Sequence, residues 1–137
     1  MKEETESCSH QQPVRKSKKW LIALILIPIF IVIAYLFICW NIGAGVHSIS
    51  KIALRDHPGD QVSALMALVE SEQHGYRERN LAIWALGQLG DSRALPLLER
   101  LYTGKASDET VALSQYEIKK AIVLCKGALN ISAFVWR

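Results

Sequence analysis

The sequence predicts an all-α protein in which one N-terminal transmembrane helix precedes a short solenoid of two helical hairpins. Three observations lead to this prediction. Residues 20–46 contain no Lys, Arg, Asp, Glu or His. Beyond residue 60, the apolar residues recur at helical spacing, without the alternation that is typical of strands. The expected helices also fall into two pairs with the same apolar order, as copies of one structural unit do.

The charge-free segment has the length and composition of a membrane span, which we assign to residues 20–41. Residues 21–39 are almost entirely apolar. A helix of about 20 residues rises roughly 30 Å, which is the thickness of the hydrocarbon layer of a bilayer. Trp20 and Trp40 stand at the two ends, where amphipathic rings favour the membrane interface. The segment therefore predicts contact with a lipid bilayer.

A cleaved signal peptide is the alternative interpretation of the same segment. Gly43, Ala44 and Gly45 are small residues of the kind that a signal peptidase accepts. However, the apolar stretch is longer than the usual signal core of about 7–15 residues, and residues 1–19 precede it. These two features favour an uncleaved anchor.

The charges on either side of the span predict its orientation. A basic cluster precedes it, formed by Arg15, Lys16, Lys18 and Lys19. Positively charged flanks stay on the cytoplasmic side, so the N-terminus should be inside and the C-terminal domain outside, in the periplasm or the extracellular space. Residues 1–19 are polar and lack apolar periodicity, and we expect them to be a disordered tail.

Composition and motif spacing argue against several classes of function. Residues 42–137 carry eleven basic and ten acidic residues, a balance without the basic footprint of a nucleic-acid-binding protein. Cys8 and His10 form a C-x-H pair, but two ligands do not make a metal site. Cys125 lies on an apolar helix face and is expected to be a core residue. With no Gly-rich phosphate loop and no metal spacing, we expect no enzyme activity and no cofactor.

Four helices are expected after the span. Their ranges are 60–71, 76–89, 93–102 and 109–126, and their expected N-terminal caps are Asp60 for the first, Asp91 and Ser92 for the third, and Ser107 and Asp108 for the fourth. Short connections between them predict two antiparallel hairpins. Together with the flanking segments they make up a repeat domain over residues 59–137.

The two hairpins look like copies of one unit. Residues 64–68 match residues 94–98 at an offset of 30. In the second helices, Ala82, Ala85, Leu86 and Leu89 match Ile118, Ala121, Ile122 and Cys125 at an offset of 36. Both sets follow the i, i+3, i+4, i+7 stripe of a helix that buries one face. A helical pair repeated at this period is typical of an α-solenoid.

Residues 79–98 read RNLAIWALGQLGDSRALPLL and resemble the short HEAT repeat first associated with phycobilisome lyases. The second hairpin departs from this pattern, with Gln115 where the Arg would stand and Lys126 in place of the Gly-Asp turn. The resemblance implies packed helix pairs and usually a protein-binding role, with lyase activity confined to a subset of the family.

The motif residues also have structural explanations. Gly87 is small enough for two helices to approach closely. Gly90 can adopt the left-handed conformation that ends a helix. Asp91 can cap the next helix. Pro96 falls near the first turn of that helix, where a missing N–H costs least.

The opposite face of the second helices is the expected partner-binding surface. At 100° per residue this face carries Asn80, Trp84 and Gln88 in the first hairpin, with Tyr116, Lys120 and Leu124 as their counterparts. In HEAT-like arrays this helix layer lines the concave side. We therefore predict a mixed aromatic and polar surface that binds an unidentified protein partner, at Asn80, Trp84, Gln88, Tyr116 and Lys120. The alternative is that Trp84 only packs between neighbouring helices.

The segments that flank the hairpins are expected to complete a solenoid of only two repeats. Residues 42–58 form a linker or a capping helix, which either continues the membrane helix or covers the first repeat with Val46, Ile49 and Ala53. The C-terminal segment is apolar, and Ile131, Phe134 and Trp136 should fold back over the last helix or dock on another subunit.

The sequence thus predicts a membrane-anchored, non-catalytic platform for protein interaction or assembly. The alternative is a small single-span subunit whose transmembrane helix assembles with or regulates a membrane transporter or complex.

Overall fold

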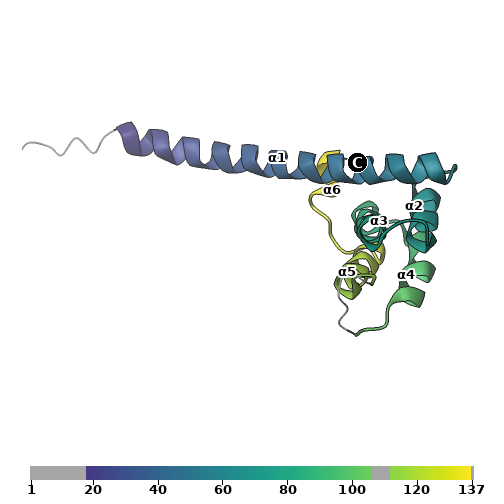
Figure 1. Cartoon of the computed structure of the whole chain (residues 1–137). Helices are drawn as coiled ribbons and strands as arrows, with labels where there is room; N and C mark the ends of the chain where they lie inside the picture. Colours follow the sequence, from purple (N-terminus) through teal and green to yellow (C-terminus); the bar gives the residue numbers. More distant parts are fainter. Residues whose placement is uncertain (1–17, 106–111, 137) are drawn as a thin grey trace, which may run out of the picture. The chain divides into compact units, whose positions relative to one another are not determined.

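The computed structural model describes residues 18–105 and 112–136, and within them it contains helices and no strand. The elements are α1 (Lys18–Asp56), α2 (Gln61–Glu70), α3 (Tyr76–Leu89), the 3-10 helix η1 (Ser92–Ala94), α4 (Leu95–Leu101), α5 (Gln115–Cys125) and α6 (Ala133–Trp136). Figure 1 labels the six α-helices. The predicted all-α class, with one long apolar helix before short helical hairpins, is confirmed.

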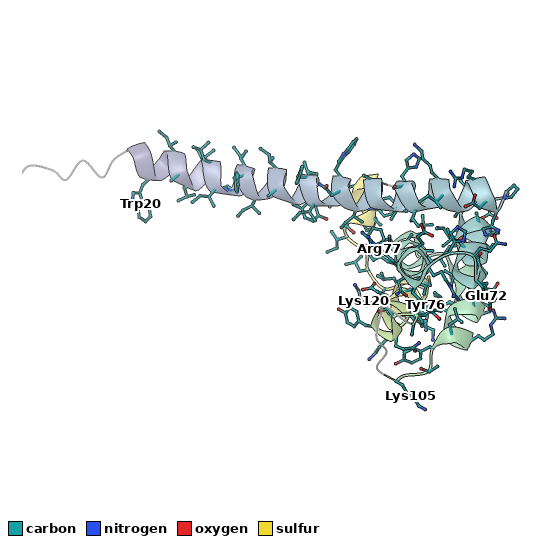
Figure 2. All side chains as sticks on the ribbon, in the orientation of Figure 1. Trp20, Glu72, Tyr76, Arg77, Lys105 and Lys120 are labelled. Atoms are coloured by element: carbon teal, nitrogen blue, oxygen red, sulfur yellow. The ribbon has the colours of Figure 1, made fainter. Side chains whose placement is uncertain are left out.

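The chain divides into two compact units, residues 1–34 and residues 35–137, and α1 contributes to both. In the first unit, the described side chains stand off the helix into open space (Figure 2), and Phe30 is 71% exposed. From residue 22 to its end, α1 is long and apolar enough to cross a membrane; among the described residues it is the only helix that is.

In the second unit, α1 does not end at residue 41 but continues to Asp56 and supplies one wall of the core. Val46, Ile49 and Ala53 are 1%, 3% and 0% exposed. Their spacing of three and four residues places them on one helix face, as the sequence pattern predicts. The buried Ser50 hydroxyl accepts a hydrogen bond of 2.8 Å from the side chain of Gln61 in α2. The end of α1 therefore continues the long helix and also packs on the first hairpin.

Helices α2 and α3 form the first hairpin close to their predicted bounds. The Asp60 side chain accepts a hydrogen bond from the backbone N–H of Ser63 and so caps α2, as expected. Gly90 ends α3 with φ at 61°, in the left-handed region where a residue with a Cβ is strained.

The turn between α3 and α4 is built around Asp91. Its carboxylate accepts a hydrogen bond of 2.9 Å from the backbone N–H of Arg93 and caps η1, which leads directly into α4. Pro96 lies in the first turn of α4, as predicted. The Arg93 guanidinium is 2.9 Å from Asp91 and 3.1 Å from Asp60. Hydrogen bonds from the Arg93 side chain and backbone lower the pKa of Asp91.

Helix α5 begins later than the sequence suggested. Its first residue is Gln115, so the predicted start at residue 109 is wrong. Ser114 is the N-cap, and its hydroxyl accepts a hydrogen bond of 3.3 Å from the N–H of Glu117. The expected caps Ser107 and Asp108 lie outside the described residues.

The repeated apolar stripes meet in the core, as the repeat pattern predicts. Ala82, Ala85 and Leu86 of α3 are fully buried, and Ile118, Ala121 and Cys125 of α5 are 0%, 1% and 4% exposed. The remaining members of the two stripes, Leu89 and Ile122, are half-buried and pack against the core. A Cβ on Gly87 would lie 2.8 Å from the Cα of Ala121. Gly87 therefore permits the close approach of α3 and α5.

The C-terminal segment folds back, but only in part and onto a different helix than expected. Ala133 is 3% exposed, and Trp136 is half-buried and packs against the core. A Cβ on Gly43 would lie 2.7 Å from the Cβ of Trp136, so the indole docks on α1 rather than over α5. Ile131 and Phe134 are 59% and 81% exposed, so the first alternative, in which they fold over the last helix, is not what the structure shows. Docking on another subunit stays a prediction.

Candidate interaction surface

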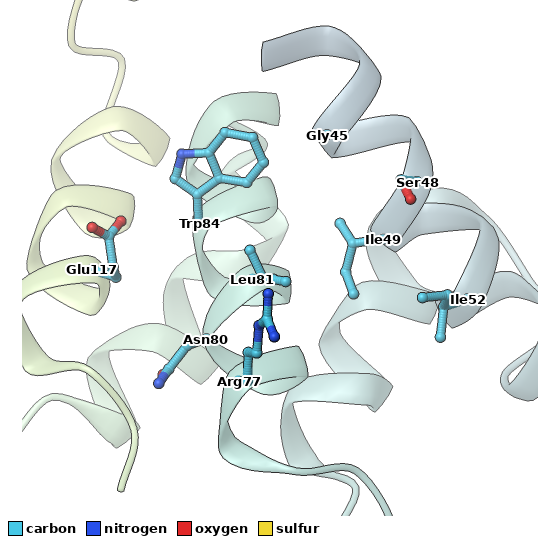
Figure 3. Close-up of a pocket in the computed structure, with 9 residues that line it drawn as sticks. All are labelled: Gly45, Ser48, Ile49, Ile52, Arg77, Asn80, Leu81, Trp84 and Glu117. Carbon is cyan, nitrogen blue, oxygen red and sulfur yellow. The ribbon is translucent and has the colours of Figure 1, made fainter. Parts of the chain in front are cut away.

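An open groove with a volume of about 840 Å³ lies between α1 and α3, with α5 at its edge. Figure 3 shows the side chains that line it: Ser48, Ile49 and Ile52 from α1; Arg77, Asn80, Leu81 and Trp84 from α3; and Glu117 from α5, with Gly45 at one end. The aliphatic side chains and the indole make up the apolar part of the lining, and Figure 3 shows the Arg77 guanidinium beside Leu81 and Glu117 on the α5 side. Such a groove fits a partner that presents apolar side chains next to polar ones.

The groove exists because α1 extends past the apolar segment and runs beside α3. Ile49 is almost fully buried and joins the core, whereas Leu81 is 43% exposed. Leu81 directly precedes the buried Ala82 stripe on α3, so its side chain points to the edge of the core rather than into it. Figure 3 shows Leu81 and Trp84 on α3 and Ile49 and Ile52 on α1 facing the same space.

Trp84 is both a packing residue and a lining residue. Its ring lies against α1 at Gly45. A Cβ added to Gly45 would lie 3.1 Å from Cη2 of the indole. The side chain is half-buried and packs against the core. The interpretation that Trp84 packs between helices therefore agrees with its contact with Gly45, and the same side chain also lines the groove.

The polar residues of the predicted surface are engaged within the chain. The Asn80 side chain accepts a hydrogen bond of 2.8 Å from the N–H of Ser114 and donates one of 3.4 Å to the carbonyl of Ala112. It thereby holds the segment that enters α5. The Gln88 side chain accepts a hydrogen bond of 3.1 Å from Asn130, which ties the C-terminal segment to α3.

Tyr116 and Lys120 lie on α5, outside the groove itself. Tyr116 is 66% exposed, and the Lys120 ammonium stands 5.1 Å from the centre of its ring. Lys120 also pairs with Glu117 at 3.4 Å, and Glu117 does line the groove. A salt bridge at this exposure contributes little to stability.

The structure therefore places the five predicted residues at three locations rather than on one continuous face. Asn80 and Trp84 line the groove, Tyr116 and Lys120 form an exposed pair beside it, and Gln88 contacts the C-terminal segment. Whether these residues bind a partner stays a prediction.

Sequence reasoning did not assign the α1 residues, Arg77, Leu81 or Glu117 to this surface, although it named Ile49 as a residue that could cover the first repeat. The sequence did contain an indication for Leu81, because this residue is apolar but does not belong to the stripe of Ala82 that is expected to be buried. The α1 residues carried none, since their pattern describes only the face that joins the core.

The described residues contain no group of three or more His, Cys, Asp or Glu side chains placed to hold a metal ion. The Cys8 and His10 pair lies outside them.

No curated protein and no solved structure matches the chain significantly. A family model does match its central part. Residues 79–103, which comprise most of α3 together with η1 and α4, match the family described as the PBS lyase HEAT-like repeat. The resemblance in the sequence is thereby confirmed for these residues, and the centre of the chain carries a HEAT-like repeat.

Proposed function

We propose that this protein is a single-pass membrane protein whose HEAT-like domain binds another protein in the groove between α1 and α3. The observation that carries the proposal is the groove itself, an open and largely apolar surface beside α3, most of which lies in the matched HEAT-like repeat. The role is that of a scaffold rather than a catalyst. It supports docking or assembly at a membrane.

The properties of α1 support the anchor. Its side chains between residues 22 and 38 are largely exposed apolar groups, which are stable in lipid and costly in water. Trp20 and Trp40 are 78% and 75% exposed and frame this segment, as interfacial aromatic residues do. The basic cluster at residues 15–19 favours a cytoplasmic N-terminus, with the HEAT-like domain outside the cytoplasm.

The groove indicates the chemistry of the partner. Ile52, Leu81 and Trp84 offer an apolar surface of the kind that receives aliphatic or aromatic anchors. Arg77 and Glu117, which also line the groove, carry opposite charges. A partner segment with an apolar centre, an acidic group toward Arg77 and a basic group toward Glu117 would complement this groove.

Site-specific crosslinking from position 81 tests the groove. A photo-reactive amino acid replaces Leu81 in the full chain, and the matched control places it at Val123 of α5, which is 51% exposed and outside the groove. We expect a discrete crosslinked product of one size from position 81 and none from position 123. Equal products from the two positions, or none from position 81, would contradict binding in the groove.

A substitution in the groove then shows whether the crosslinked product depends on the apolar lining. Ile52→Asp places a charge in the groove from a half-buried position of α1. This change should abolish the crosslink from position 81, whereas Lys51→Asp on the exposed side of the same helix should leave it unchanged.

A second candidate function is an assembly role for the transmembrane helix itself. The unit formed by residues 35–137 allows a clean separation, because residues 20–34 can be replaced by an unrelated apolar helix without touching that unit. Retained partner capture supports the groove, and loss of capture by a membrane-inserted chimaera supports the helix.

The anchor has its own test. The full-length protein should stay with the membrane after alkaline carbonate extraction. Release into the soluble fraction would contradict the membrane span.

A further inference from the structure

The last part of the chain, residues 127–136 with α6, is called the C-terminal turn below. It packs against the last part of the charge-free segment of α1. Val135 and Trp136 line a second groove, of about 990 Å³, together with Leu36, Trp40 and Gly43. All five residues belong to the unit formed by residues 35–137. The contact of Trp136 with Gly43 fixes α6 at this place on the helix.

The burial of Cys39 supports the same packing. Cys39 is fully buried, whereas the adjacent Phe37 and Ile38 are 68% and 57% exposed. Leu36, Cys39 and Gly43 are three and four residues apart and therefore share one face of α1. A residue on an isolated helix is not fully buried, so other parts of the chain cover this face.

This packing determines which part of α1 lies beside α6. Leu36 and Gly43 are separated by about 10 Å along the helix axis at roughly 1.5 Å per residue, and Trp40 lies between them. Leu36 and Trp40 belong to the segment that the proposed function places in lipid. The C-terminal turn therefore lies where the charge-free segment reaches its end.

Most of the apolar side chains in residues 127–136 are exposed. Leu129, Ile131, Phe134 and Val135 are 75%, 59%, 81% and 44% exposed. Residues 127–136 contain no charged side chain. Exposed apolar groups concentrated in one segment indicate a surface that another phase or molecule covers.

We propose that this C-terminal turn inserts into the membrane interface and forms a second lipid contact beside the point where α1 leaves the bilayer. The inference rests on the proposed membrane anchor and adds a contact that the anchor alone does not require. Lipid is the occupant because the turn is packed onto the same stretch of α1 that carries Trp40, an exposed interfacial residue. Phe134 enters the boundary between headgroups and acyl chains, as aromatic and aliphatic residues of interfacial segments do.

Depth-dependent fluorescence quenching tests this contact in the full-length protein reconstituted in phosphatidylcholine vesicles. Cys8→Ser removes the N-terminal thiol, and Cys39 and Cys125 are too buried to be labelled, at 0% and 4% exposure. Phe134→Cys then carries an environment-sensitive dye. Leu129→Cys provides a second position on the same turn.

Two further positions serve as references. Tyr116→Cys, at a site 66% exposed on α5, reports on the water-facing part of the domain. Phe30→Cys, at a site 71% exposed on α1, reports on the span. Nitroxide groups are placed either near the headgroup or deep in the acyl chain of the lipid.

We expect the dye at position 134 to emit at shorter wavelength and to lose intensity with the shallow nitroxide, and position 129 to behave in the same way. The dye at position 116 should show neither effect. Position 30 should be quenched by the deep nitroxide.

The remaining outcomes separate the two proposals. Quenching at position 30 without quenching at positions 134 and 129 overturns the lipid contact and leaves the anchor intact. A shift to shorter wavelength at position 134 without lipid quenching also overturns it, because another protein surface or a second copy then covers the turn. Absence of quenching at position 30 overturns the anchor itself.

Discussion

Gln115 in the second hairpin performs the role that Arg79 performs in the first. The Arg79 guanidinium donates a hydrogen bond of 2.7 Å to the carbonyl of Val69 near the end of α2. The Gln115 side chain donates one of 3.2 Å to the carbonyl of Leu101 at the end of α4. Both satisfy a carbonyl that the preceding helix leaves without a partner in its own last turn. The substitution at the motif position therefore preserves the contact although the charge is lost.

We expect Arg79→Ala to lower the free energy of unfolding by about 1.5–3 kcal/mol, the usual contribution of a hydrogen bond from a charged group. Arg79→Gln should recover part of the loss, because glutamine makes the equivalent contact in the second hairpin. Denaturant unfolding in detergent micelles, followed by tryptophan fluorescence, measures both. Arg77→Ala is the control, since Arg77 is exposed on the same helix. Equal effects at positions 77 and 79 would contradict the interpretation.

Gly87→Ala should destabilise the domain by about 1–3 kcal/mol, because the added methyl group overpacks a close helix contact. Its Cβ would meet the backbone of Ala121 at 2.8 Å, and a backbone atom cannot move aside as a flexible side chain can. Gly75→Ala is the matched control. A Cβ at position 75 has nothing within 4 Å, and the backbone φ of −66° suits any residue. A loss at position 87 no greater than that at position 75 would argue against tight α3–α5 packing.

Gly43→Ala should detach the C-terminal turn without unfolding the domain. The new Cβ would lie 2.7 Å from the Cβ of Trp136, close to the backbone of α6, while alanine itself favours the helix by about 1 kcal/mol. Detachment is measured as faster carboxypeptidase digestion in detergent micelles. Gly45→Ala is the control, because there the nearest atom, at 3.1 Å, belongs to the tip of the Trp84 ring. Equal digestion rates for both variants would contradict the docking of Trp136 on Gly43.

The Asp91–Arg93 pair predicts a loss of stability in acid. Hydrogen bonds from Arg93 lower the pKa of Asp91 below its usual value of 3.8 in the folded protein. Because the folded state favours the ionised carboxylate, this stabilisation is present above the unfolded pKa and is lost as the pH falls through the folded pKa. The melting temperature should therefore decrease as the pH falls below about 4.

The variant Asp91→Asn isolates this contribution. It should melt at a lower temperature than the parent protein at neutral pH, and the two curves of melting temperature against pH should converge in acid. Gln73→Ala, at an exposed residue of the loop between α2 and α3 that has no titratable group, should leave the difference between neutral and acidic pH unchanged. Parallel curves for Asp91→Asn and the parent protein would contradict the role of the pair.

The sequence predicted most of the first hairpin because each boundary carries a residue that the backbone requires. Asp60 caps one helix and Gly90 ends another, both as expected. The start of α5 was predicted wrongly because two serines could each serve as the N-cap of this helix. Ser107 and Ser114 both suit an N-cap, and only Ser114 is followed three residues later by an acidic residue, the capping-box spacing that would have selected it.

The candidate groove was less predictable, because helical periodicity identifies a face but not what the rest of the chain places over it. Asn80 and Gln88 are on the predicted face of α3, yet their side chains bond to segments that approach from α5 and from the C-terminus. The glycines at 43 and 45 looked like small residues near a cleavage site. In the structure, Trp136 packs against Gly43 and the ring of Trp84 packs against Gly45. No local sequence pattern links residues that are so distant along the chain.

The apolar strip at the end of α1 leaves the ribosome before the helices that bury it. Ribosomes make chains from the N-terminus at roughly 5–20 residues per second, so Val46, Ile49 and Ala53 are synthesised a few seconds before α3 is complete. Until those helices are made, no part of the domain covers the strip. A translation pause between residues 56 and 90 would prolong the life of a nascent chain with an uncovered apolar strip, the kind of intermediate that chaperones recognise.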